Sequence, residues 1–272
     1  MNIKFDNLKS IYFLQKIFDF LPQKKFLKVI KYNKKIQQKL NISIEDYKKY
    51  NEIEIEIIPV KNVSGEFINI KDEDKQYYHV FFNDNQKEMK RNYLKKDDKV
   101  TTIKIILDFQ IKSFYKLFNK CKTIKSIHFK RYNRNNFRNM SYMFSDCSNI
   151  ETINLSNFNT ENVINMQNMF GCPLLKELNL SNFNTENVTN MSYMFCGCKL
   201  LKELNISIFN TNKVQTMVGM FCFCSSLKTT DFSNFNVKNS TQFGMMFQGC
   251  LAELKAKAKA QIKDIADIAF LH

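Results

Sequence analysis

The stretch LLKELNLSNFNTENVTNMSYMFCGC, residues 174–198, decides the fold, because a close copy precedes it in the chain. The copy, ETINLSNFNTENVINMQNMFGC, occupies residues 151–172. Alignment on the Met-Phe pair reveals further copies on both sides. The pair occurs at intervals of 26, 25, 26 and 26 residues, at Met143-Phe144, Met169-Phe170, Met194-Phe195, Met220-Phe221 and Met246-Phe247. A repeat of this length indicates stacked structural units.

The register extends one copy upstream, to Leu117-Phe118, so that six turns are supported. Within the unit, Leu178 and Leu180 alternate as the inward residues of a short strand do. Val188, Met191 and Met194 follow at three-residue intervals, which suits a short helix or 3₁₀ turns on the far side. Such a unit buries its apolar face only against its neighbours. The pattern therefore predicts an α/β solenoid with a parallel sheet along one side.

The words LKELNLSNFNTENVTNMSYMFCGC and IETINLSNFNTENVINMQNMFGC resemble leucine-rich repeats, and more closely the BspA-like family. The unit of that family reads roughly L-x-x-L-x-L-S-x-F-x-T-x-x-V-x-x-M-x-x-M-F-x-x-C. The resemblance covers about residues 100–250. It implies a leucine-rich-repeat-like, right-handed coil of 25–26-residue turns. The family is found on bacterial surfaces and, in expanded form, in protists, and it implies an interaction scaffold rather than a chemistry.

Four segments are expected. Residues 1–45 form a helical segment, residues 46–99 a small β-rich region with a charged connector, residues 100–250 the six turns, and residues 251–272 a C-terminal helix. The β-rich region is indicated by IEIEIIPV, EFINI and YYHVFF. The last segment stands apart because it holds all six alanines of the chain. It is either a cap on the last turn or a foreign tail.

The phrase LQKIFDFLPQKKFLKVIKYNKKIQ, residues 14–37, resembles an F-box: an apolar helix, a proline, and a second helix. The resemblance spans residues 8–42. It implies docking on the Skp-type adaptor of a cullin ubiquitin ligase through Ile17, Phe18, Leu21 and Pro22. The alternative is that these helices only cap the repeats.

The outward face of the sheet is the usual place where stacked repeats bind partners. We expect it to present Glu, Asn and Ser side chains: Glu151, Asn154, Glu177, Asn179, Ser181, Glu203 and Asn205. The function expected is a non-enzymatic protein–protein interaction scaffold, in its most concrete form an F-box-like substrate adaptor with an unidentified protein partner. Alternatives are a BspA-like surface or adhesin-type protein and a plain solvated sheet face, because the face has no aromatic anchor.

A further alternative is a basic solenoid that binds nucleic acid or anionic lipid. The net charge of the chain is +15, and no acidic residue lies between Asp108 and Asp146. A basic protein favours acidic partners, although a solvated lysine surface is common. The candidate basic patch consists of Lys122, Lys125, Lys130, Arg131, Arg134 and Arg138.

Cysteine recurs at one position of the repeat: Cys121, Cys147, Cys172, Cys198, Cys224 and Cys250. A ladder of small buried side chains is the expected role. Cys196, Cys198, Cys222 and Cys224 also form two C-x-C pairs one turn apart, which leaves a zinc site and a disulfide ladder as alternatives. A column of asparagines, Asn133, Asn159, Asn184, Asn210 and Asn236, is expected to stack and to satisfy backbone groups of the bend.

The N-terminal stretch MNIKFDNLKSIYFLQKIFDFLPQKK carries a charge in every apolar run and has no small-residue cleavage site. No segment approaches the roughly 20 apolar residues that span a bilayer. We therefore expect an intracellular, cytoplasmic protein without a transmembrane segment and with mostly reduced cysteines. No Gly-rich phosphate loop or nucleophile motif occurs, so we expect neither enzymatic activity nor a cofactor.

Overall fold

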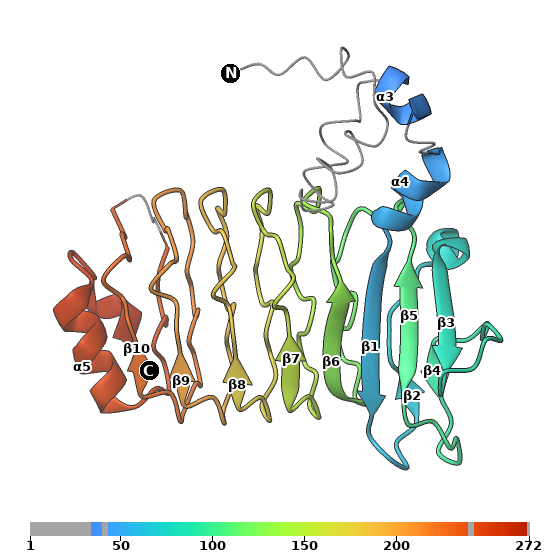
Figure 1. The fold of residues 1–272 in the computed structure, drawn as a ribbon. Helices are drawn as coiled ribbons and strands as arrows, with labels where there is room; N and C mark the ends of the chain where they lie inside the picture. The colour runs from blue at the N-terminus through green and yellow to red at the C-terminus, as the bar shows by residue number, and fades with distance from the viewer. Residues whose placement is uncertain (1–33, 40–42, 239–241, 271–272) are drawn as a thin grey trace. The chain divides into compact units, whose positions relative to one another are not determined.

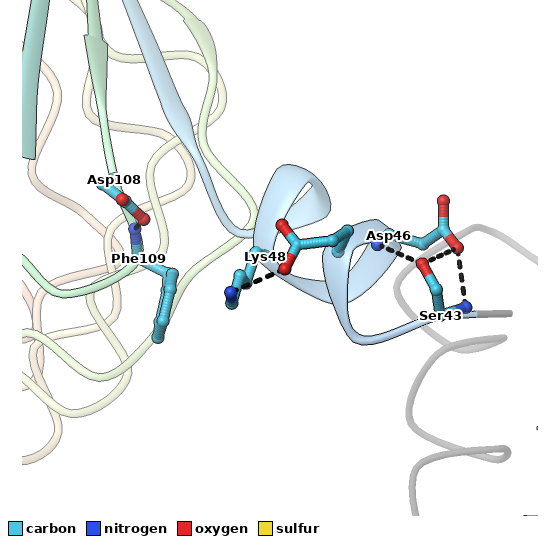
Figure 2. Close-up of polar contacts among 6 residues, drawn as sticks. Ser43, Asp46, Lys48, Asp108 and Phe109 are labelled. Atoms are coloured by element: carbon cyan, nitrogen blue, oxygen red, sulfur yellow. Dashed lines mark hydrogen bonds and ion pairs between the residues drawn. The ribbon is translucent and has the colours of Figure 1, made fainter.

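The computed structural model describes residues 34–39, 43–238 and 242–270 (Figure 1). The chain divides into two compact units, Met1–Glu52 and Ile53–His272. In the first unit, the described helices are α3 (Lys34–Lys39) and α4 (Ile44–Tyr50). Ser43 begins α4 with a reciprocal cap: its hydroxyl and its N–H each donate to Asp46 Oδ2 at 2.7 Å, and the Asp46 N–H donates to Ser43 Oγ at 3.2 Å (Figure 2).

The second unit is built on a six-stranded mixed sheet with the order β3-β5-β1-β6-β7-β8. β1, β3 and β5 are antiparallel to their neighbours, whereas β6, β7 and β8 run parallel. Their bounds are β1 Ile53–Pro59, β3 Tyr78–Phe82, β5 Ile103–Leu107, β6 Ile124–Arg131, β7 Thr152–Asn154 and β8 Glu177–Leu178. Alternate residues of β1, β3 and β5 are buried, as expected for a sheet with one face on the core.

Two smaller sheets complete the strands of this unit. β2 (Gly65–Glu66) pairs antiparallel with β4 (Tyr93–Leu94), and a 3₁₀ helix, η2 (Asp72–Tyr77), precedes β3. β9 (Glu203–Leu204) pairs parallel with β10 (Thr229–Thr230). Figure 1 shows β7, β8, β9 and β10 at corresponding places in successive repeats. β8 and β9 belong to different sheets, so the strand pairing is interrupted between these two repeats.

The repeats are also joined on the far side, where the sequence spacing predicted a short helix or 3₁₀ turns. Parallel bridges there connect Asn139, Asn165, Asn190, Thr216 and Gln242 in order. The N–H groups of Met191, Tyr193 and Phe195 donate to carbonyls of the next repeat at 2.8–3.0 Å. The residue in the middle of each such turn has a positive φ: Lys116, Tyr142, Asn168, Tyr193, Gly219 and Met245. These segments are therefore turns whose N–H groups bond the neighbouring repeat.

The predicted α/β solenoid is therefore wrong. The structure is mostly sheet, its main sheet is mixed rather than parallel, and helices are few. Of the described residues between 78 and 251, none is helical. The three-residue spacing of Val188, Met191 and Met194 was the misleading signal, because turns that place one buried side chain every third residue produce the same spacing.

The core of the second unit consists of columns of like side chains. One phenylalanine per repeat stacks on the next at centroid separations of 5.3–5.9 Å: Phe118, Phe144, Phe170, Phe195, Phe221, Phe247 and Phe270. Met191 and Met194, like the methionines at the same positions of the other repeats, are fully buried. Offset-stacked rings of this kind add stabilisation beyond that of area burial.

The C-terminal segment follows the last repeat with the helix α5 (Ala252–Gln261) and the 3₁₀ helix η3 (Asp267–Phe270). The N–H of Met245 donates to the Ile268 carbonyl at 3.0 Å, and that of Phe247 donates to the Ala269 carbonyl at 2.8 Å. These bonds continue the ladder between repeats, and Phe270 continues the phenylalanine stack. The segment thus occupies the place that a further repeat would take. Within the described ranges, no helix has the length and apolar character needed to cross a membrane.

Candidate partner-binding site

The outward face of the sheet carries a hollow of about 800 Å³ where β8 and β9 are not paired. Four of the predicted face residues line it: Glu177, Asn179, Glu203 and Asn205. The remaining lining residues are Lys176, Leu178, Leu180, Leu200, Lys202 and Ser226. The interruption of the sheet and the predicted face therefore coincide at one place in the structure.

Leucine side chains give this hollow its apolar character. Leu178 and Leu180 are buried beneath it, whereas Leu200 is 40% exposed at its edge. Leu174, the counterpart of Leu200 one repeat earlier, is also exposed, at 38%. Binding sites combine an apolar lining with a few placed polar groups, and this hollow has both.

Charges are arranged in two neighbouring rows across the strands. Pairing places Ser126, Thr152 and Glu177 side by side, with Glu203 and Thr229 continuing that row. Glu151 therefore lies one residue outside it, between Lys125 and Lys176, and its carboxylate oxygens lie 4.0 Å from the ammonium of each. Lys202 has no such carboxylate within ion-pair distance among the described residues. The hollow thus presents an unpaired lysine beside the acids Glu177 and Glu203.

The asparagines of the face already use their side-chain oxygens. Asn154, Asn179 and Asn205 accept from the backbone N–H two residues later at 2.9–3.1 Å, and the donor in the second case is Ser181. These side chains therefore hold the bend after each strand. Asn154 and Ser181 are exposed and do not line the hollow.

The asparagines of the predicted column also form hydrogen bonds within their own repeat. Asn159, Asn184, Asn210 and Asn236 each accept from the N–H two residues on within their own repeat. At this bend, the side-chain hydrogen bonds between repeats are made by Thr160, Thr185 and Thr211, which are at most 1% exposed. Sequence reasoning missed these threonines, although the recurring word FNT contains all three.

One of the six residues of the predicted basic patch is buried. Arg134 is 4% exposed, and its guanidinium donates to the Asp108 carbonyl at 3.2 Å and to the Ile111 carbonyl. Burial lowers the pKa of Arg134 to about 10. It occupies the repeat position that Thr160 holds one repeat later, which explains its burial.

Of the other five members of the patch, three have a carboxylate within 4.0 Å. Lys130 Nζ lies 3.0 Å from Glu56 and Arg131 lies 3.8 Å from Glu54, both on β1, while Lys125 faces Glu151. Lys122 and Arg138 are exposed. The acids of β1 lie some seventy residues away in the sequence, so the absence of acids between Asp108 and Asp146 did not reveal the pairing.

A second hollow, of about 400 Å³, is lined by residues 60–63 and 94–101 and contains four lysines, Lys61, Lys95, Lys96 and Lys99. Asp98 in the same lining is engaged by Arg91, whose two terminal nitrogens donate to it at 2.6 and 2.9 Å. This concentration of positive charge was not predicted from the sequence. The F-box-like residues Ile17, Phe18, Leu21 and Pro22 lie outside the described residues.

The cysteines fall into two groups. Cys196 and Cys222 form a disulfide between adjacent repeats, whereas Cys121, Cys147, Cys172, Cys198, Cys224 and Cys250 are free. The expected reduced state therefore does not describe Cys196 and Cys222. Cys198 and Cys224, the other two candidates for zinc, are buried, and each thiol donates to a phenylalanine carbonyl.

The fold and this surface define a class: a β-rich repeat protein with a hollowed outer sheet face. A family model described as "Mycoplasma protein of unknown function, DUF285" matches residues 87–173 and again residues 172–269. Because the two matches together span more than half of the chain, the chain belongs to that family. The second match includes most of the alanine-rich segment. No curated protein and no solved structure matches the chain.

Proposed function

We propose that the chain is a non-enzymatic scaffold that binds a protein partner in the hollow between β8 and β9. The observation that carries the proposal is the meeting, in one concave surface, of exposed Leu200 with the charges of Lys202 and Glu203, neither of which has an ion-pair partner among the described residues. An apolar anchor surrounded by polar groups is the usual centre of a protein interface. The BspA-like resemblance supports the same class of function.

The residues that line the hollow indicate the chemistry of the partner. A short segment with an apolar side chain would cover Leu200, and flanking groups of both charge signs would pair with Lys202 and with Glu177 or Glu203. Such pairs at the edge of an interface contribute more to specificity than to affinity. The intracellular location and the F-box-like adaptor role are finer forms of this proposal.

Site-specific photo-cross-linking in the native cell tests the proposal. A cross-linking residue in place of Leu200 is expected to capture a discrete partner. The matched control is Ile208, which is 47% exposed but does not line the hollow. Capture of the same adducts from both positions, or a partner captured only from Ile208, would refute the proposed site.

A second candidate, a surface or adhesin-type protein, is favoured by the Cys196–Cys222 disulfide, because disulfides persist in oxidising compartments. Thiol trapping in intact cells separates the two locations. In a surface protein, Cys196 and Cys222 are expected to form the disulfide, and a reductant that cannot cross membranes is expected to reduce it. A cytoplasmic protein is expected to have this pair reduced and to be unaffected by that reagent.

A further inference from the structure

The disulfide joins the two repeats between which the sheet is interrupted. Cys196 belongs to the repeat of β8 and Cys222 to the repeat of β9, and their Cα atoms are 4.7 Å apart. Leu200 follows Cys196 by four residues, and Ser226 follows Cys222 by four residues. Both of these residues line the hollow. The covalent link therefore lies directly before two segments that form its edge.

The other six cysteines are chemically protected. Five of their thiols donate to a phenylalanine carbonyl of an earlier repeat at 2.8–3.2 Å: Cys147, Cys172, Cys198, Cys224 and Cys250. Burial raises the pKa of Cys198 to about 12 and that of Cys250 to about 11. Burial also raises the pKa of Cys121, Cys172 and Cys224. Since the thiolate is the reactive form, these residues resist oxidation and exchange.

We propose that Cys196 and Cys222 form a reversible thiol–disulfide site that exchanges with small-molecule thiols and disulfides and thereby controls the hollow between β8 and β9. Cys196 is half-buried, whereas Cys222 is 3% exposed, so an external thiolate attacks the sulfur of Cys196. The sulfur–sulfur bond breaks and Cys222 leaves as a thiolate. A second external thiolate then attacks the external sulfur of the mixed disulfide and releases the thiolate of Cys196.

The two external thiols leave as one disulfide, so two electrons pass to the protein and both of its thiolates then take protons from water. Re-oxidation by a small-molecule disulfide reverses the same steps. The exchange requires no cofactor.

The structure indicates what the exchange changes. At the turns, the two repeats remain joined without the disulfide, since Phe195 and Gly197 donate to the Met220 and Cys222 carbonyls at 2.9 and 2.8 Å. Further along the chain, the segments of Leu200 and Ser226 lead into β9 and β10, which pair in parallel, and the Lys228 N–H donates to the Lys202 carbonyl at 2.9 Å. Reduction therefore leaves the stack and the β9–β10 pairing intact, and it removes only the covalent restraint on the segments of Leu200 and Ser226 at the edge of the hollow. This proposal does not rest on the identity or existence of a partner.

Thiol labelling of the native full-length protein tests the chemical step. After exposure to reduced glutathione, an alkylating reagent is expected to modify two cysteines, Cys196 and Cys222, while the other six react only after unfolding. Re-exposure to oxidised glutathione should return the count to zero. Labelling of any of the six free cysteines in the native state, or failure of Cys196 and Cys222 to close again, would overturn the proposal.

Amide hydrogen exchange tests the structural step. Reduction is expected to speed exchange about tenfold in residues 199–206, with little change in residues 140–150. Cys222→Ser should show the fast rate in both redox conditions, and serine is native to this repeat position at Ser145. Gln248→Ser, the same position one repeat later, is the control and should keep the redox response. Equal rates for reduced and oxidised wild-type protein, or a redox response that survives in Cys222→Ser, would refute control of the hollow.

Discussion

Thr185 and Asn210 exchange two hydrogen bonds across adjacent repeats. The Thr185 hydroxyl donates to the Asn210 carbonyl at 3.1 Å and accepts from the Asn210 N–H at 2.8 Å. Thr185 is 1% exposed, so water does not replace these bonds. The same exchange recurs from Thr160 to Asn184 and from Thr211 to Asn236, and it joins repeats where no strand does.

Replacing Thr185 with valine is expected to lower the free energy of unfolding by about 2–4 kcal/mol, because a buried N–H and a buried carbonyl lose their partner. Denaturation in urea measures the effect. Thr185→Ser keeps the hydroxyl and should cost about 1 kcal/mol, the value of a buried methyl group. If the valine variant is as stable as the serine variant, the hydrogen bonds make no net contribution to the free energy of unfolding.

Gly219 is needed for space as well as for its backbone conformation. Its φ is +58°, and a Cβ there would collide with the ring of Tyr193. Gly197 has a φ of +77° with nothing within 4 Å of such a Cβ. Gly197→Ala should therefore lower the free energy of unfolding by about 1–2 kcal/mol, because alanine is disfavoured in the left-handed conformation. Gly219→Ala should lower it by at least about 1 kcal/mol more, because of the collision with Tyr193. Equal melting temperatures for the two variants would contradict this reading.

Asp98 makes part of the stability depend on acid pH. Hydrogen bonds from the Arg91 guanidinium hold the pKa of Asp98 below its ordinary value of 3.8. The folded state thus binds this proton less readily than the unfolded chain. The stabilisation is complete above pH 3.8 and is lost as the pH falls through the folded-state pKa.

Asp98→Asn should therefore destabilise the protein by about 1 kcal/mol at pH 7, a value reduced for partial solvent screening. The difference from wild type should vanish below the folded-state pKa. Urea unfolding of both proteins along a pH series provides the measurement. A difference that stays constant with pH would indicate that the charge of Asp98 is not responsible.

The F-box-like adaptor role predicts that residues 1–45 alone determine adaptor binding. Purified Skp-type adaptor should be recovered with the intact chain and lost when residues 1–45 are deleted. Ile17→Asp tests the docking residues with less disturbance, and Lys24→Asp, in the same stretch, serves as its control. Recovery that is absent, or equal for intact and truncated chains, rules out this role but leaves the hollow as a candidate site.

The repeat register could be predicted from the sequence, because the period is set by large buried side chains such as Phe170 and Phe195. The interruption between β8 and β9 could not, because the two repeats read almost alike. The burial of Arg134 was hidden for a related reason: its position in the register was visible, but its carbonyl partners, at Asp108 and Ile111, depend on how the first repeat meets the preceding strands.

Similarly, the mixed sheet arises because β1 pairs antiparallel with β6. These strands lie about seventy residues apart, so the local periodicity of the sequence could not predict their pairing. Only part of the thiol chemistry could be predicted from the sequence. The adjacency of Cys196 and Cys222 follows from the register, but only the structure shows that these two bond to each other while Cys198 and Cys224 donate to phenylalanine carbonyls. The outward orientation of Glu177, Asn179, Glu203 and Asn205 could be predicted from the alternation of the strands. The exposure of Leu200 could not.

The most direct test of the binding account is the affinity of a partner captured at Leu200, measured by titration with purified wild-type protein, Leu200→Asp and Ile208→Asp. Both variants place a carboxylate at an exposed apolar position of the same repeat, so they match in charge and surface. The account predicts at least about tenfold weaker binding for Leu200→Asp, as for loss of a central anchor, and unchanged binding for Ile208→Asp. Wild-type affinity in Leu200→Asp, with its fold intact, would contradict it.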